Sequence, residues 1–139
     1  MNWSSVPEGK RKTSAVPYVC IVNGSLRIPQ CALRLLPEPP EEYHRVELLE
    51  AKENGKPVIG LRFRKEDAEG IRLKHAKYPF GAVKMLYCYD RVKLRELFGE
   101  TDAVATVTTR YRVETDADSP NILIIREKME RRGPNETMD

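Results

Sequence analysis

The chain has 139 residues, of which 24 are Lys or Arg and 21 are Asp or Glu, so its formal charge at pH 7 is +3. This length accommodates one compact domain or two very small ones and excludes a multidomain enzyme. With 40% hydrophobic and 32% charged residues, the composition excludes a wholly disordered chain, and no apolar run approaches the roughly 18 to 20 residues of a membrane-spanning helix.

The first part of the chain predicts a basic arm followed by a β-rich unit. Residues 1–15 have no periodicity and carry three consecutive basic residues, so we expect a flexible arm. Residues 16–22 form a short apolar run typical of a strand, which the turn dipeptide Asn23-Gly24 ends. Proline favours the first position of a helix, so residues 30–36 after Pro29 predict a two-turn helix.

A hairpin completes this first unit, which we assign to residues 16–64. Apolar runs at 46–50 and 58–64 flank the turn dipeptide Asn54-Gly55. Alternation in the second run places Ile59, Leu61 and Phe63 on one face and Arg62 and Arg64 on the other. Residues 65–78 are polar and charged, which predicts a linker or surface loop.

Residues 79–128 predict a second, related unit. Residues 80–89 are typical of a strand, Asp90 of a helix N-cap and Gly99 of a helix stop after residues 91–98. The Thr- and Val-rich residues 104–113 predict a long strand, residues 116–121 a turn and residues 122–126 a closing strand. We expect residues 129–139 to form a flexible tail. The sequence therefore predicts a mostly β (α+β) fold with two short helices.

Cysteines and histidines are too few to suggest a metal or catalytic site. Cys20, Cys31 and Cys88 are odd in number and form no CxxC pair, so we expect small core residues rather than disulfides or a zinc site. His44 and His75 both lie in strongly charged stretches. The N-terminal segment contains no apolar region typical of a secretory signal peptide, so we expect a soluble, cytoplasmic protein.

Candidate acid–base pairs do not point to an enzyme either. Glu66 with Asp67, and Asp116 with Asp118, lie in polar loops, where we expect solvated carboxylates, whereas acid–base catalysis needs a shielded site. The glycines form no phosphate-binding loop. We therefore expect no catalytic residues, no cofactor and no bound metal.

The segment from Gly24 to Leu36 resembles the motif of AbrB-like swapped-hairpin transcription regulators and antitoxins. The matching residues are Gly24, Leu26, Ile28, Pro29, Arg34 and Leu36. An offset of 61 residues aligns this segment with the second unit, so the chain is similar to an internally duplicated, MraZ-like protein. The resemblance implies a small barrel of hairpins, as a monomeric pseudo-dimer or a homodimer, and DNA binding in transcription regulation.

Charge is distributed in alternating blocks, which leaves two functions open. Residues 1–36, 37–59, 60–99, 100–121 and 122–139 carry net charges of +4, −3, +5, −3 and 0. A continuous basic face favours a nucleic-acid-binding protein. Its expected contacts are Lys10, Arg11, Lys12, Arg27, Arg34, Arg62 and Arg64.

Separated acidic and basic faces favour the alternative, a non-enzymatic protein-interaction module. Such a module resembles an antitoxin or an inhibitor encoded by a mobile element, acting by electrostatic docking or nucleic-acid mimicry. The predicted strand at 104–113 offers it a sheet edge for a partner strand.

Aromatic residues add a second signal in the basic block. Tyr78, Phe80, Tyr87 and Tyr89 are interspersed with lysines, a pattern that suits base stacking beside phosphate contacts. On a strand, however, Tyr87 shares a face with apolar neighbours, so we expect it in the core. The sequence leaves the environment of Tyr78 and Phe80 open.

Overall fold

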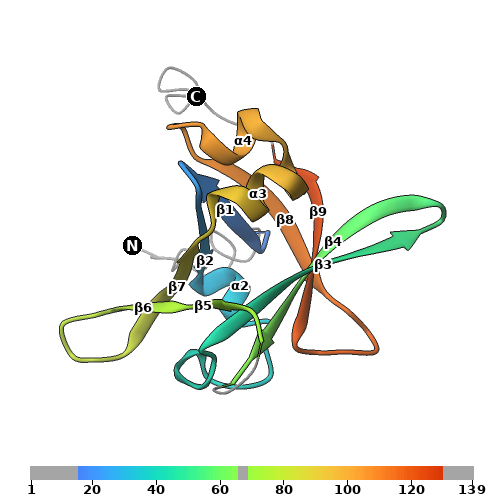
Figure 1. The fold of residues 1–139 in the computed structure, drawn as a ribbon. Coiled ribbons are helices and arrows are strands. Elements are labelled where there is room, and N and C mark those ends of the chain that lie inside the picture. Colours follow the sequence, from blue (N-terminus) through green and yellow to red (C-terminus); the bar gives the residue numbers. More distant parts are fainter. Residues whose placement is uncertain (1–15, 66–68, 130–139) are drawn as a thin grey trace, which may run out of the picture.

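The computed structural model describes residues 16–65 and 69–129, which form a single, nearly closed antiparallel sheet with short helices (Figure 1). The fold is therefore mostly β, as the sequence predicts. The strand order is β5-β3-β4-β9-β8-β1-β2-β7-β6. The strands are β1 (Tyr18–Val22), β2 (Ser25–Pro29), β3 (Arg45–Glu53), β4 (Lys56–Arg64), β5 (Ile71–Arg72), β6 (Lys74–Lys77), β7 (Val83–Tyr89), β8 (Thr109–Thr115) and β9 (Ile122–Lys128).

Both predicted Asn-Gly hairpin turns are confirmed. Asn23 and Gly24 have φ angles of 47° and 77°, and Asn54 and Gly55 have φ angles of 53° and 80°. Two consecutive positive φ angles match the twist of the flanking strands, and Asn-Gly is the dipeptide that adopts them at least cost. These turns fix the β1–β2 and β3–β4 hairpins, and the β3–β4 arm projects from the body (Figure 1).

The helices agree with the sequence in part. Helix α3 (Arg91–Phe98) forms as predicted, because the Asp90 carboxylate accepts a hydrogen bond from the backbone N–H of Lys93 at 3.0 Å, and Gly99 follows it. Helix α2 (Gln30–Leu33) is shorter than the expected residues 30–36, and a 3-10 turn η1 (Pro40–Glu42) follows it.

Two expected elements differ in the structure. Helix α4 (Glu100–Val104) occupies the start of the predicted strand at 104–113, so β8 begins only at Thr109. Burial of Ala103, together with acidic residues in the first turn, favours this helix. Strand β8 also lies between β9 and β1, so it offers a partner no sheet edge.

The charged segment 65–78 contains β5 and β6 rather than only a loop. These two short strands lie at the ends of the strand order and are separated by Leu73 alone, whose N–H donates to the His44 carbonyl at 2.8 Å. Leu73 is 4% exposed. One buried leucine therefore joins the two ends of the sheet in a segment that is mostly polar.

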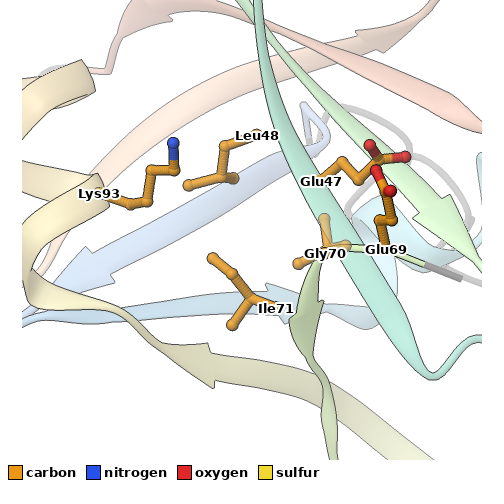
Figure 2. Close-up of a pocket in the computed structure, with 7 residues that line it drawn as sticks. Glu47, Leu48, Glu69, Gly70, Ile71 and Lys93 are labelled. Atoms are coloured by element: carbon orange, nitrogen blue, oxygen red, sulfur yellow. The ribbon is translucent and has the colours of Figure 1, made fainter.

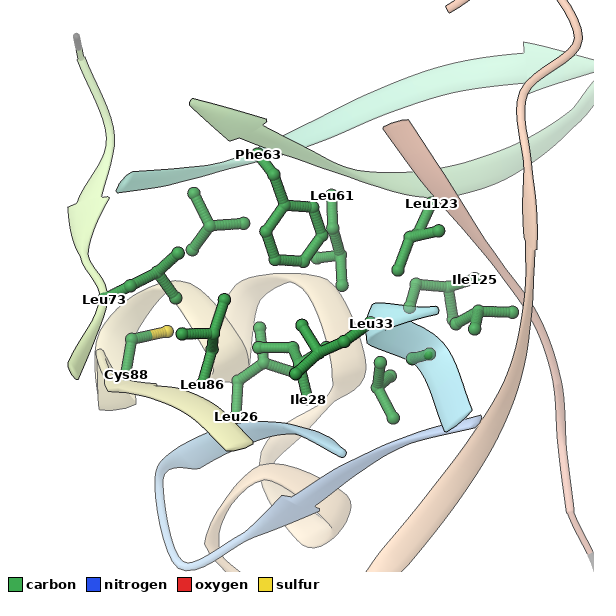
Figure 3. Close-up of a cluster of buried hydrophobic side chains, with 14 of the residues drawn as sticks. Leu26, Ile28, Leu33, Leu61, Phe63, Leu73, Leu86, Cys88, Leu123 and Ile125 are labelled. Carbon is green, nitrogen blue, oxygen red and sulfur yellow. The ribbon is translucent and has the colours of Figure 1, made fainter. Parts of the chain in front are cut away.

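The interior is filled from both predicted units, whose strands are intermixed in the one sheet. Figure 3 shows side chains of β2 and β7 facing side chains of β4 and β9 across the core. Leu61 and Phe63 are buried as predicted, whereas Ile59 is half-buried. Of the cysteines, Cys88 is buried, and Cys20 and Cys31 are half-buried. Within the described ranges, no helix is long and apolar enough to cross a membrane.

Candidate nucleic-acid interface

A row of side chains crosses five neighbouring strands on the outer surface of the sheet. Cys20 on β1 is opposite Arg110 on β8 and Arg27 on β2, and the next register pairs are Arg27 with Tyr87 and Tyr87 with Lys74. The chain neighbours of these residues point inward, because side chains on a strand alternate between its two faces. The row therefore runs across the outside in the order Arg110, Cys20, Arg27, Tyr87, Lys74.

Aromatic rings lie beside the cations of this row. The Arg110 guanidinium is 4.5 Å from the centroid of the Tyr18 ring, and the Lys74 ammonium is 5.6 Å from that of Tyr89. Cation–π attraction holds these charges over the rings. We call this surface the basic–aromatic face and define it as Tyr18, Arg27, Lys74, Tyr87, Tyr89 and Arg110.

Tyr87 belongs to this face and not to the core, so that expectation was wrong. Strand β7 buries Leu86 and Cys88, which turns the alternate residues Tyr87 and Tyr89 outward. Their rings meet edge to face at 5.9 Å, and Tyr89 is 57% exposed. Apolar or aromatic side chains occur on both faces of β7, and for this reason the sequence pattern alone suggested that Tyr87 is buried.

Cys20 is the second residue of the row and lies between Arg110 and Arg27. Burial raises the pKa of the Cys20 thiol, and the positive charges of Arg110 and Arg27 act in the opposite direction. Two guanidinium groups thus flank one half-buried side chain.

The structure does not bring Arg62 and Arg64 to this face. Both donate to Oε1 of Glu47, at 3.4 and 2.7 Å, and their strand β4 is four strands away from β2. Arg34 is exposed at the C-terminal end of α2. The remaining expected contacts, Lys10, Arg11 and Lys12, lie outside the described residues.

Two further outward arginines, on β8 and β9, are paired with glutamates. Arg126 binds Glu53 at 2.7 Å and Glu114 at 2.6 Å, and these ion pairs raise the pKa of Arg126 and lower that of Glu53. Arg112 is paired with Glu127 and Glu114. In the part of the chain that the structure describes, Arg27, Lys74 and Arg110 form no such ion pair, which leaves their charge available.

Sequence reasoning missed Arg110, Lys74 and Tyr18. Lys74 lies in a segment predicted as a loop, Tyr18 in an apolar run and Arg110 in a predicted strand. Only the pairing of distant strands makes them neighbours. The one available signal was the absence of acidic residues from Gly70 to Tyr89, a stretch with four Lys or Arg residues.

A pocket of about 270 Å³ lies elsewhere, between β3, β5 and α3 (Figure 2). Leu48 and Ile71 form its apolar floor, and Lys93 lies across it from Glu47 and Glu69. Glu47 already accepts from two arginines, so it is not free to bind a ligand. Among the described residues, no group of three or more His, Cys, Asp and Glu side chains is arranged to hold a metal ion.

Comparison with known protein families, with curated proteins and with solved structures finds no match for this chain. The AbrB-like resemblance therefore stays a prediction from the motif residues. Those residues have local structural roles: Gly24 adopts the turn, Leu26 and Ile28 are fully buried, and Pro29 precedes α2.

Proposed function

We propose that this protein binds nucleic acid through the basic–aromatic face. The observation that carries the proposal is the cross-strand row in which Arg110, Arg27 and Lys74 remain without a carboxylate partner among the described residues. Outside this row, Arg62, Arg64, Arg112 and Arg126 each form an ion pair with a glutamate. An uncompensated basic stripe beside exposed rings is the arrangement that nucleic-acid backbones and bases complement.

The dimensions of the face suit a short stretch of nucleic acid. Four inter-strand steps separate β8 from β6, and at about 4.8 Å each they span about 19 Å. Guanidinium and ammonium groups at both ends and in the middle of that span contact phosphates. Tyr18, Tyr87 and Tyr89 contribute ring surface between them.

The test is binding of fluorescein-labelled oligonucleotides, measured by anisotropy at roughly 50 and 200 mM salt. We expect wild-type affinity to fall steeply with salt. Arg27→Ala, Arg110→Ala and Lys74→Ala should each weaken binding and reduce the slope of log K against log salt by about 0.7 to 0.9 for each phosphate that is no longer neutralised. Thermal unfolding of each variant checks that it remains folded.

The matched control is Arg62→Ala together with Arg64→Ala, which removes two positive charges from β4, four strands away from β2. We expect this variant to bind within about twofold of wild type, because both guanidinium groups are held by Glu47 and lie outside the row. Equal weakening by the control and the face variants would contradict the proposal. Absence of binding at low salt would overturn it in favour of the protein-interaction alternative.

A further inference from the structure

We infer that the tip of the β6–β7 hairpin stacks an unpaired base, so that the nucleic acid bound is single-stranded. This inference rests on the proposed function. It adds a second binding element, which we call the tip platform and define as Tyr78 and Phe80 with Lys84.

Two parallel aromatic rings form the platform. The Tyr78 and Phe80 rings are stacked with centroids 5.1 Å apart and an interplanar angle of 6°. The turn is closed by hydrogen bonds from Tyr78 N–H to the Ala82 carbonyl at 2.8 Å and from Gly81 N–H to the Tyr78 carbonyl at 2.9 Å. Backbone hydrogen bonds therefore preorganise the stack before any ligand arrives.

The platform remains uncovered. Phe80 is 78% exposed and Tyr78 is 39% exposed, on a hairpin that extends away from the body (Figure 1). Exposing that much ring surface to water is unfavourable, by about 25 cal/mol for each Å² of apolar area. A flat aromatic ligand that stacks on Phe80 removes this cost, and a nucleobase has such a face whatever its sequence.

Positive charge surrounds the platform. The Lys84 ammonium is 5.9 Å from the centroid of the Tyr78 ring, and Lys77 immediately precedes Tyr78. No Asp or Glu occurs from Gly70 to Tyr89. This charge favours a polyanion over an apolar protein segment as the molecule that covers the rings.

The same hairpin connects the platform to the basic–aromatic face. Lys77 is three positions after Lys74 along β6, which corresponds to about 10 Å at about 3.3 Å per residue. A nucleic-acid strand that leaves the basic–aromatic face at Lys74 thus reaches the tip platform within one or two nucleotides. In a duplex the bases are already stacked on their neighbours, and exposing one costs a few kcal/mol. Stacking on the platform therefore favours unpaired bases.

The experiment compares one labelled 12-nucleotide single strand with the duplex of the same sequence, at one salt concentration, for wild type and for Phe80→Ala. We expect wild type to prefer the single strand by at least tenfold. Phe80→Ala should weaken single-strand binding by about 5- to 150-fold, the range for losing one stacked base. Its duplex affinity should change by less than about twofold.

Two further variants make the test specific for stacking. Val92→Ala, which trims another exposed apolar side chain, should leave binding unchanged. Phe80→Trp should retain single-strand binding, and its added fluorescence should be quenched when the oligonucleotide binds. Phe80 is exposed, so these variants should keep wild-type thermal unfolding.

The outcomes separate this inference from the proposed function. Equal or tighter binding of the duplex, or equal weakening of both ligands by Phe80→Ala, would overturn the single-strand inference while nucleic-acid binding stands. Binding of neither ligand would overturn both.

Discussion

Arginines in similar local patterns have different surroundings in this protein. Arg62 lies between two buried residues, Leu61 and Phe63, and Arg27 lies between Leu26 and Ile28, so alternation correctly turns both arginines outward. Their neighbours across the sheet differ: Arg62 is opposite Glu47, whereas Arg27 is opposite Tyr87. Sequence pattern predicted the face of each strand, but register between distant strands decided which cations are neutralised.

Cys88 gives a prediction on pH dependence. Burial raises the pKa of its thiol to about 12, so the folded chain keeps this proton where the unfolded chain, with a pKa of about 8.5, loses it. The resulting stabilisation is fully present below about pH 8.5 and disappears as the pH rises toward 12, by about 1.4 kcal/mol for each pH unit in between.

Urea unfolding of wild type and Cys88→Ala at several pH values between about 7.5 and 10.5 measures this dependence. The stability advantage of wild type should shrink as the pH rises. Val83→Ala, which changes a buried non-titrating residue on the same strand, is the control and should differ from wild type by a constant amount. A difference in unfolding free energy between wild type and Cys88→Ala that does not change with pH would contradict the raised pKa of the Cys88 thiol.

At the scale of elements, the sequence predicted structures whose signals are local. The two Asn-Gly hairpins and helix α3 with its Asp90 cap depend on residues within a few positions of one another. Residues 65–78 and 104–108 were misread because packing against distant parts of the chain decides them. Leu73 is buried. The backbone N–H of Gly24 donates a hydrogen bond to the backbone carbonyl of Ala103 at 2.6 Å. Such interactions leave no periodic signal in the sequence.

The two hairpin turns provide an element-scale prediction. Alanine at Gly24 or at Gly55 must adopt a positive φ, which costs about 1 to 2 kcal/mol. A Cβ at Gly55 meets no atom within 4 Å, whereas a Cβ at Gly24 lies 3.2 Å from Nε of Arg91. Nη2 of the same arginine donates to Oδ1 of Asn23 at 2.7 Å. Gly24→Ala should therefore lose about 1 kcal/mol more unfolding free energy than Gly55→Ala.

Urea unfolding of both glycine variants beside wild type measures the difference. Losses of the same size would show that the β1–β2 turn tolerates a side chain against α3, contrary to the packing described here.

Across the whole molecule, closure of the sheet depends on Leu73. Replacing it with Ala should lower the free energy of unfolding by about 2 to 5 kcal/mol, because the cavity lies where the two sheet ends meet. Ile71→Ala, two residues earlier and only half-buried, is the matched control and should cost less. Equal midpoints of urea unfolding for the two variants would contradict this role of Leu73.

The overall class of the fold was predictable, but its connectivity was not. Alternating apolar strands and turn dipeptides indicated a mostly β protein with short helices. The order in which strands of residues 16–64 and 79–128 adjoin is set by long-range pairing, such as β4 with β9 and β1 with β8. The basic–aromatic face depends on that order, and therefore only its Arg27 was among the expected contacts.

The position of β9 bears on how the chain folds as a ribosome makes it. Among the described strands β9 is synthesised last, yet it lies between β4 and β8 and pairs with both. Until residues 122–128 emerge, both neighbours keep an unpaired edge, which is a template for aggregation. Sheet completion thus waits until this strand has left the ribosome, and a nonsense mutation before Ile122 would leave a nascent product with two open edges instead of a smaller stable domain.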